Sequence, residues 1–323
     1  MKKNEGGKKK RFRRRCFVEG EVHHIYQRTV KRFNIFYDLE DYLVYFTIFA
    51  IAARQYNVTV SGLCLMFDHI HMLIKADNRV IMSEFVRQVT SMFAREQNND
   101  VGRKGSLFQA RFGSAVKKGS KMVRTAIAYL FNNPVERSLC KRAEEYRWNF
   151  LAYAVSAHPF SNSINPNTAS TKLKRAMKEV KTAESLDRHL RYSQLKRLLD
   201  CLKNNEKMQL VDYIISIYNP IDYDESIQYY GTYETMLIAI NSNTGSEYEI
   251  KEERYKFSDI EYIHMSDILR NEEGIRELRK ITGLDIDEKM RLFKGLRQRV
   301  TCSNLPICKF LHLDITESQH LNH

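Results

Sequence analysis

The chain has 323 residues, of which 43% are hydrophobic and 28% charged, so it can bury a sizeable core and is long enough for two domains. Its longest apolar run, Tyr42 to Ala53, is too short to span a bilayer, and the residues after the basic N-terminus are too polar for a signal peptide. We therefore expect a cytoplasmic protein with no membrane partner. None of the six cysteines has C-x-x-C spacing, which argues against a zinc ribbon or a disulfide framework.

The net charge of +13 is unevenly distributed along the chain. Residues 1–149 contain 28 Lys and Arg against 14 Asp and Glu, whereas residues 150–323 contain 24 against 25. The segregation favours a polyanion partner for the first half, most plausibly nucleic acid. The alternative is a solvated basic surface that serves solubility.

The first half alternates strands and helices. Residues 1–15, with nine Lys and Arg, are expected to be a disordered basic arm that binds nucleic acid or is merely a soluble tail. The hydrophobic pattern then predicts, in order, a strand over 16–28, a helix over 39–56, strands over 58–66 and 69–75, a helix around 82–93, a glycine-bearing loop from 102 into a strand ending near 117, and a helix over 120–133.

We expect Pro134 to end the last of these helices. The order β-α-β-β-α-β-α predicts an α+β fold with a ferredoxin-like antiparallel sheet, in which the third strand is central.

The second half looks mainly helical. Residues 148–169 are irregular, so we place a linker at 151–169 between a domain over 16–150 and a helical domain over 170–323. The apolar segments Ile275–Leu284 and Leu305–Leu313 suggest a helix-turn-helix within 275–315. An ordinary helical bundle explains them equally well.

Two histidines, His69 and His71, lie one residue apart in the predicted central strand. Side chains at i and i+2 share a face of a strand, so both imidazoles can meet one metal ion. His-x-His alone is a weak pattern, and on that evidence structural histidines would be the better interpretation.

Four ordered motifs strengthen the pattern. They are His23-His-Ile-Tyr-Gln-Arg28, Cys64-Leu-Met-Phe-Asp-His-Ile-His-Met-Leu-Ile74, Gly105-Ser-Leu-Phe-Gln-Ala-Arg-Phe112 and Ala128-Tyr-Leu-Phe-Asn-Asn-Pro-Val135. Together they resemble the REP-associated tyrosine transposases, a branch of the single-tyrosine HUH (IS200-like) transposase superfamily. The resemblance covers about 130 residues and leaves the second half unassigned.

The resemblance implies a chemistry. A tyrosine attacks a DNA phosphodiester, forms a 5′-phosphotyrosine link and leaves a free 3′-OH, with a divalent metal polarising the phosphate. By resemblance the nucleophile is Tyr129, and the metal ligands are His69, His71 and Asn133. Two imidazoles and one amide oxygen suit Mg²⁺ or Mn²⁺.

The resemblance also implies DNA as the partner, single-stranded and often beside a hairpin, and a nucleoid-associated location in a prokaryotic-type cell. The oligomeric state stays open, with a homodimer as one alternative.

Several residues are candidates for binding DNA. Residues 103–147 carry eleven Lys and Arg against three Asp and Glu, with interleaved aromatic residues that can stack on unpaired bases. The candidates are Arg28, Arg103, Lys104, Phe108, Gln109, Arg111, Lys117 and Lys118. The competing interpretation is that the aromatic residues belong to the core and the polar ones to a solvated surface, that Tyr129 is a helix core residue, and that Asn133 caps a helix end.

The chain also departs from the family pattern. Phe67-Asp68 stands where Pro-Asn is common, and Thr29 where glycine is common, and Asp68 either adds charge beside the metal or only makes the turn. The leading hypothesis is thus a metal-dependent single-strand DNA endonuclease and strand transferase. The rivals are a non-cutting, domesticated DNA-binding regulator and, disfavoured by the charge, a small-molecule metallohydrolase.

Overall fold

The computed structural model describes residues 16–242 and 258–314. A four-stranded antiparallel sheet forms its centre, in the order β2-β3-β1-β4. The strands are β1 (Val22–Arg28), β2 (Thr59–Met66), β3 (His69–Lys75) and β4 (Gly113–Lys117). With its βαββαβ connection this is the predicted ferredoxin-like sheet, and β3 is central as expected.

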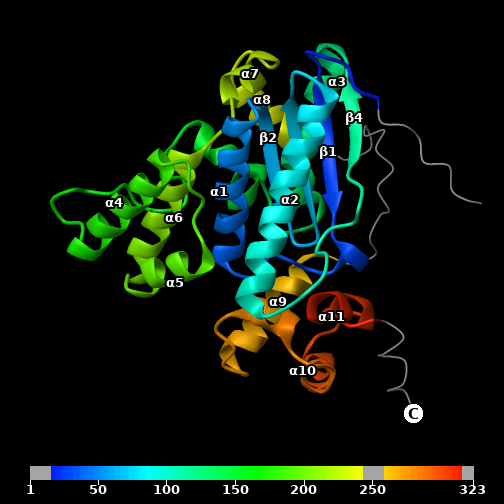
Figure 1. The fold of residues 1–323 in the computed structure, drawn as a ribbon, viewed down its shortest axis with the longest axis vertical. Helices are drawn as coiled ribbons and strands as arrows, with labels where there is room; N and C mark the ends of the chain where they lie inside the picture. The colour runs from blue at the N-terminus through cyan, green and yellow to red at the C-terminus, as the bar shows by residue number, and fades with distance from the viewer. Residues whose placement is uncertain (1–15, 243–257, 315–323) are drawn as a thin grey trace, which may run out of the picture.

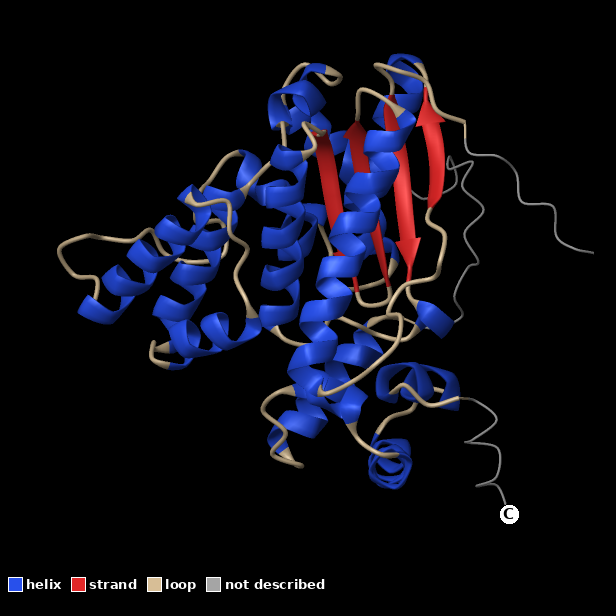
Figure 2. Cartoon of the chain, in the orientation of Figure 1, coloured by secondary structure: helices blue, strands red, loops and turns tan. Residues whose placement is uncertain are grey.

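Helices cover both faces of the sheet (Figures 1 and 2). On one face lie α1 (Leu39–Gln55) and α2 (Arg79–Val101), and on the other lies α3 (Gly119–Glu136). Residues of β3 alternate between the two layers, because Ile70, Met72 and Ile74 join the core under α1 and α2 whereas Leu73 joins the cluster under α3. Short 3-10 helices follow β1 and α3; they are η1 (Val30–Arg32), η2 (Ala143–Glu145), η3 (Arg147–Asn149) and η4 (Leu151–Ala154).

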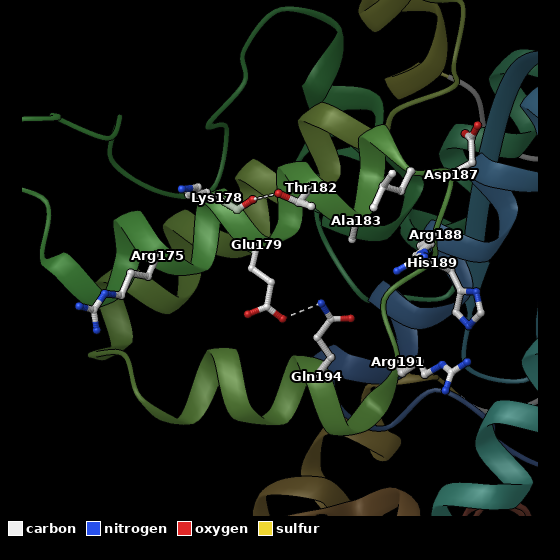
Figure 3. A pocket seen from close by; sticks show the side chains of 11 residues that line it. Arg175, Lys178, Glu179, Thr182, Ala183, Asp187, Arg188, His189, Arg191 and Gln194 are labelled. Carbon is white, nitrogen blue, oxygen red and sulfur yellow. Dashed lines mark hydrogen bonds between the residues drawn. The ribbon is translucent and has the colours of Figure 1, made fainter.

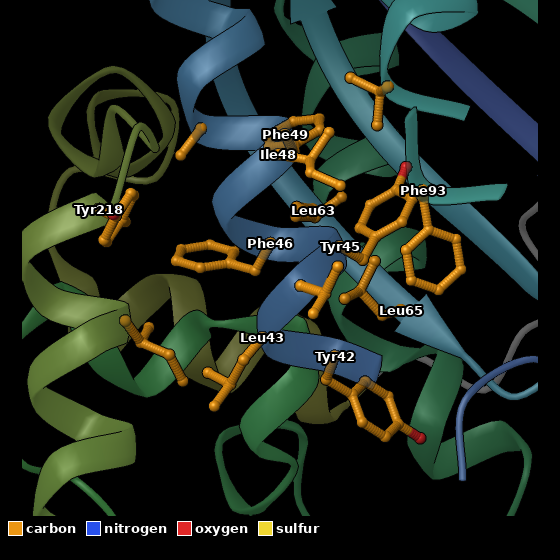
Figure 4. Packing of buried hydrophobic residues seen from close by; sticks show 14 of the residues in the cluster. Tyr42, Leu43, Tyr45, Phe46, Ile48, Phe49, Leu63, Leu65, Phe93 and Tyr218 are labelled. Atoms are coloured by element: carbon orange, nitrogen blue, oxygen red, sulfur yellow. The ribbon is translucent and has the colours of Figure 1, made fainter. Parts of the chain in front are cut away.

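Helix α1 is buried on nearly every side, as its almost continuous apolar sequence requires. A capping box between Asp38 and Asp41 begins it. Its aromatic side chains fill the space between the sheet and the neighbouring helices, with Phe36 stacked on Tyr42 and Phe46 on Phe150 (Figure 4). This layer packs on one face of the sheet, and α3 packs on the opposite face.

Pro134 does not end α3, contrary to the prediction. The helix continues to Glu136, with Pro134 inside its last turn. Proline removes one N–H, but its φ is compatible with a helix, and the N–H of Arg137 still donates to the carbonyls of Asn133 and Val135. Asn133 therefore lies within the helix rather than at its end.

Three groups of helices follow the sheet. The α4–α6 unit, residues 171–218, contains α4 (Thr171–Ser185), α5 (Tyr192–Asp200) and α6 (Asn204–Tyr218) and packs beside α1. Helices α7 (Tyr223–Gln228) and α8 (Tyr233–Asn241) contact β2 and α3. The C-terminal unit, residues 258–314, contains α9 (Ile260–Asn271), η5 (Leu278–Gly283), α10 (Ile286–Arg299) and α11 (Asn304–Leu311).

The helix predicted over 275–284 is the 3-10 helix η5. The backbone N–H of Arg279 donates to Asp38 at 3.1 Å, so it is not available to an α-helical ladder. The helix-turn-helix as a DNA reader, and the division into domains, stay predictions. The predicted basic arm, 1–15, lies outside the described residues. None of the described helices has the length and apolar content that crossing a membrane requires.

The C-terminal unit is anchored by a buried arginine. The Arg279 side chain is 1% exposed and forms ion pairs with Asp38 at 3.4 Å and Asp100 at 2.7 Å, while its guanidinium lies over the ring of Tyr192 at 4.7 Å. One charge thus joins the start of α1, the end of α2, and α5 to the C-terminal unit.

Replacing Arg279 by methionine is expected to lower the free energy of unfolding by about 3–5 kcal/mol, because the buried Asp38 loses its buried counter-charge and keeps, among the described residues, only the exposed Arg270. Urea denaturation would measure the change. Arg276 is exposed three residues earlier, so Arg276→Met is the matched control and should shift the midpoint little. Equal shifts in the two variants would contradict the anchoring role.

A second contact of the C-terminal unit predicts a pH effect on stability. His312 stacks on Phe33, its Nε2 contacts the carbonyl of Asn34 at 2.5 Å, and burial lowers its pKa to about 3. A histidine with a depressed folded pKa adds stability above its unfolded pKa of about 6.5, and this stability is lost as the pH falls below that value.

Between about pH 7 and pH 5, His312→Asn should therefore lose about 1–2 kcal/mol less stability than the unmodified protein. Asparagine tolerates the left-handed backbone at this position, where φ is 56°. The exposed His264 is the control, and its asparagine variant should follow the unmodified protein. Parallel pH curves for all three proteins would refute the assignment.

Candidate active site

The pairing of β1 with β3 brings polar side chains onto the sheet face under α3. In this antiparallel register Tyr26 lies opposite His71, and Arg28 lies opposite His69. Directly opposed residues share a face, and alternation along β1 adds His24 to the same row. The two predicted metal ligands therefore meet residues from a strand more than 40 positions earlier in the chain.

His69 and His71 are both buried, at 1% and 0% exposure, and their rings lie 4.9 Å apart between centroids. The two rings are nearly perpendicular. Burial, and then the nearby charges of His69 and Arg28, hold the pKa of His71 well below its ordinary value. A neutral imidazole is the form that binds a metal ion.

Helix α3 contributes the other two predicted residues to the same place. Tyr129 and Asn133 lie four residues apart, on one side of the helix. The Tyr129 ring lies edge-on to His71 at 5.4 Å between centroids, and Asn133 Nδ2 lies 3.5 Å from Nε2 of His71. The structure thus brings together all four residues that the sequence assigned to the reaction.

Among the buried atoms that have no hydrogen-bond partner in the described residues, two belong to the predicted metal ligands. They are Nε2 of His69 and Oδ1 of Asn133. An unpaired buried polar atom is costly, and such atoms are uncommon unless an ion or water completes them. Imidazole nitrogen and amide oxygen are both ligands for divalent cations, so the donor set fits a metal ion. Within the described ranges no cluster of three or more His, Cys, Asp or Glu is arranged to hold a metal, and any site here depends on the amide.

His24 is a site residue that the sequence analysis did not single out. Its Nε2 lies 2.9 Å from Nδ1 of His71, and its ring lies 5.6 Å from that of Tyr129. A hydrogen bond on the far nitrogen fixes the orientation of a ligating histidine and leaves the other nitrogen for the metal. The alternation of His24, Tyr26 and Arg28 along β1 was the available clue.

Asp68 does more than make the turn between β2 and β3. Its carboxylate accepts a hydrogen bond from Nδ1 of His69 at 2.5 Å, which leaves Nε2 of His69 facing the site. Burial alone would raise the pKa of Asp68, but His69, Arg32 and Arg137 outweigh burial and lower it. Asp68 therefore stays ionised and orients the first histidine, as His24 orients the second.

Thr29, the other departure from the family pattern, holds the turn in place. Its hydroxyl lies within hydrogen-bond distance of the carbonyls of Asp68, at 3.0 Å, and Phe33, at 2.7 Å, and its single proton is shared between them. A glycine at this position would lack both bonds. Asp68 therefore orients His69 directly, and Thr29 acts on the same ligand indirectly, by holding the backbone of Asp68 in place.

The predicted DNA-binding residues divide by exposure. Lys104, Gln109, Arg111 and Lys118 are exposed, while Arg28 and Arg103 are partly buried. Lys117 is buried, and Phe108 is 5% exposed and packs in the core beside Phe93. The ring of Phe108 is therefore not available for base stacking in this structure, which favours the interpretation of this residue as core.

Part of the chain matches a known protein family. Residues 18–133 match the model of the family described as transposase IS200 like. This segment is therefore similar to an IS200-like transposase. The resemblance inferred from the four motifs is thereby confirmed, and all four proposed site residues lie within or at the end of the matching segment.

A solved structure of a REP-associated tyrosine transposase bound to a REP hairpin is also similar. It shares 16% identity with a TM-score of 0.39, over 50% of this chain and 95% of that chain. No match was found among curated proteins. The second half of the chain lies outside the family match.

The orientation of His71 predicts the effect of one substitution. His24→Ala removes the bond to Nδ1 of His71, so we expect Mn²⁺ affinity to fall about 10–100-fold. Isothermal titration calorimetry without DNA would measure it. The adjacent His23 points away from the site and stacks on Phe17, so His23→Ala is the control. Unchanged Mn²⁺ binding in His24→Ala would contradict a supporting role.

Proposed function

We propose that the protein is a metal-dependent enzyme that nicks single-stranded DNA and transfers the strand, with Tyr129 as the nucleophile. A transposase role is supported by the family of residues 18–133. The observation that carries the finer proposal is the position of Tyr129. Its ring packs against His71 beside two buried, unpartnered ligand atoms, Nε2 of His69 and Oδ1 of Asn133.

His69, His71 and Asn133 would hold the metal ion, Mg²⁺ or Mn²⁺. When bound, it polarises a phosphate oxygen and stabilises the charge that develops during attack. The protein itself prepares the ligands, because Asp68 and His24 each occupy the far nitrogen of one histidine. No rearrangement of the two rings is then required on binding.

The covalent step transfers a phosphoryl group to the phenol. The Tyr129 oxygen forms a bond to phosphorus, the bond between phosphorus and the 3′ oxygen breaks, and the departing strand keeps a 3′-OH. The proton of the phenol leaves to solvent, and a proton is taken up by the 3′ oxygen. Rejoining to another 3′-OH reverses the step, which is strand transfer.

Three arginines lie near the place where the phosphate would bind, and two of them, Arg32 and Arg137, also pair with Asp68 and Asp259. Arg28, Arg32 and Arg137 are close enough to His71 to lower its pKa together. The same field stabilises a phosphodiester and a developing phenolate. These charges come from the strand, the turn and the helix end that frame the site, so they are present before DNA arrives.

The proposed nucleophile is 4% exposed in this structure. DNA can reach it only after neighbouring side chains or a loop move. We propose single-stranded DNA, next to a hairpin, as the substrate, because an unpaired strand can bend into an enclosed site more easily than a duplex. The location that follows is on DNA, in the nucleoid of a prokaryotic-type cell.

The nucleophile assignment can be tested directly. Tyr129→Phe should abolish the denaturant-resistant, Mn²⁺-dependent complex with labelled hairpin oligonucleotides from the DNA flanking the gene, while binding persists. Tyr26 is the matched control, because it is the other phenol on this sheet face, 6.2 Å from His24 between ring centroids. Tyr26→Phe should keep the complex.

Loss of the complex only in Tyr26→Phe would move the nucleophile to β1. Tight DNA binding by the unmodified protein with no covalent band at any Mn²⁺ concentration would favour the non-cutting regulator. Failure to bind single-stranded DNA at moderate salt would instead revive a small-molecule metallohydrolase.

A further inference from the structure

The α4–α6 unit carries a cleft outside the segment that matches the transposase family. It has a volume of about 820 Å³ and lies between α4 and α5, with the loop 186–191 at one end (Figure 3). Leu186 contributes apolar surface at this end and is 54% exposed. The rest of the rim is largely polar.

Four exposed cations line the cleft: Arg175, Lys178, Arg188 and Arg191. Arg191 lowers the pKa of Glu96, so it has a partial counter-charge on α2. Arg175, Lys178 and Arg188 have no carboxylate partner anywhere in the described parts of the chain. Three of the four are guanidinium groups, whose planar fork suits phosphate oxygens.

The acidic residues that line the cleft are already neutralised by other cations. Glu179 accepts from Arg197 at 2.5 Å and from Gln194 at 2.8 Å. Asp187 pairs with Arg54 of α1 at 3.4 Å, a cation that it shares with Glu184. The four exposed cations outnumber Glu179 and Asp187, so the opening presents a net positive charge.

The sequence of the unit agrees with this local charge. Residues 171–218 contain eleven Lys and Arg against six Asp and Glu, while residues 219–323 contain thirteen against nineteen. The second half has a net charge near zero because the basic residues 171–218 are followed by the acidic residues 219–323. The basic unit contains this cleft.

We propose that the cleft between α4 and α5 binds the phosphate backbone of the substrate DNA at a second place, remote from Tyr129. The charge of the cleft indicates a polyanion, and the choice of DNA as that polyanion rests on the proposed function. The α4–α6 unit packs beside α1, on the side of the sheet opposite to α3 (Figure 1). The cleft therefore contacts a part of the DNA distant from the scissile phosphate, and it contributes affinity rather than chemistry.

The test removes the three unpaired cations together, in the variant Arg175→Gln, Lys178→Gln and Arg188→Gln. All three are exposed, so the fold should be retained. Fluorescence anisotropy with long hairpin DNA over a salt series is the measurement. Three lost phosphate contacts should reduce the slope of log affinity against log salt by about 2.

The control removes the same charges elsewhere, outside the cleft and outside the predicted helix-turn-helix, in Arg79→Gln, Arg95→Gln and Lys203→Gln. These are also two arginines and one lysine, exposed and without ion pairs among the described residues. Their slope should fall by less than half as much. Equal slopes for the two triple variants would overturn the proposal, because only overall charge would then matter.

Two further measurements distinguish failure of this proposal from failure of the proposed function. With the shortest oligonucleotide that still forms the Tyr129 covalent complex with the unmodified protein, the cleft variant should form that complex equally well, because the cleft adds affinity only for longer DNA. A changed slope without any covalent complex would support the cleft and refute the enzyme. A third outcome would overturn the choice of DNA. If polyglutamate binds the unmodified protein but not the cleft variant, while both bind DNA equally well, the cleft would be assigned to an acidic protein instead.

Discussion

The pairing of β1 with β3 is the constraint on which the candidate site depends. It sets His24, Tyr26 and Arg28 in one row beside His69 and His71. A slip of one residue in this register would turn the β1 row to the core under α1 and α2. Burial of that core, including Ile25, therefore also fixes the polar row on the other face. The packing of the core and the geometry of the site are consequences of the same register.

Each histidine of the site has one nitrogen occupied by a protein partner. Asp68 holds His69 and His24 holds His71, and Nε2 of His69 is left without a hydrogen-bond partner among the described residues. The cost of these buried, unpaired atoms is tolerated where a ligand completes them. Such preparation is typical of sites that bind a metal, and here it depends on three separate segments of the chain.

The helical second half packs from two directions against the segment that matches the transposase family. The C-terminal unit contacts the start of α1 through the ion pair of Arg279 with Asp38. It contacts the end of α3 through the ion pair of Asp259 with Arg137, at 3.7 Å. Burial raises the pKa of Asp259 to about 6, so this contact lies in an enclosed environment close to the site. The α4–α6 unit lies on the other side of α1 and carries the basic cleft. The C-terminal unit therefore supports the candidate site, while the α4–α6 unit carries the cleft for which we propose DNA binding at a distance from that site.

The sequence alone determined the order of the elements, the central position of the third strand, and the spacing of Tyr129 and Asn133, because period-2 and period-3.6 patterns are local. It did not indicate His24, which acts through a contact 47 residues away, nor the burial of Phe108, nor the continuation of α3 past Pro134. It also concealed the basic cleft, whose charge depends on which carboxylates Arg197 and Arg54 neutralise. Local periodicity decides the face on which a side chain lies. Only the tertiary structure decides what that side chain meets, because its partners come from distant parts of the chain.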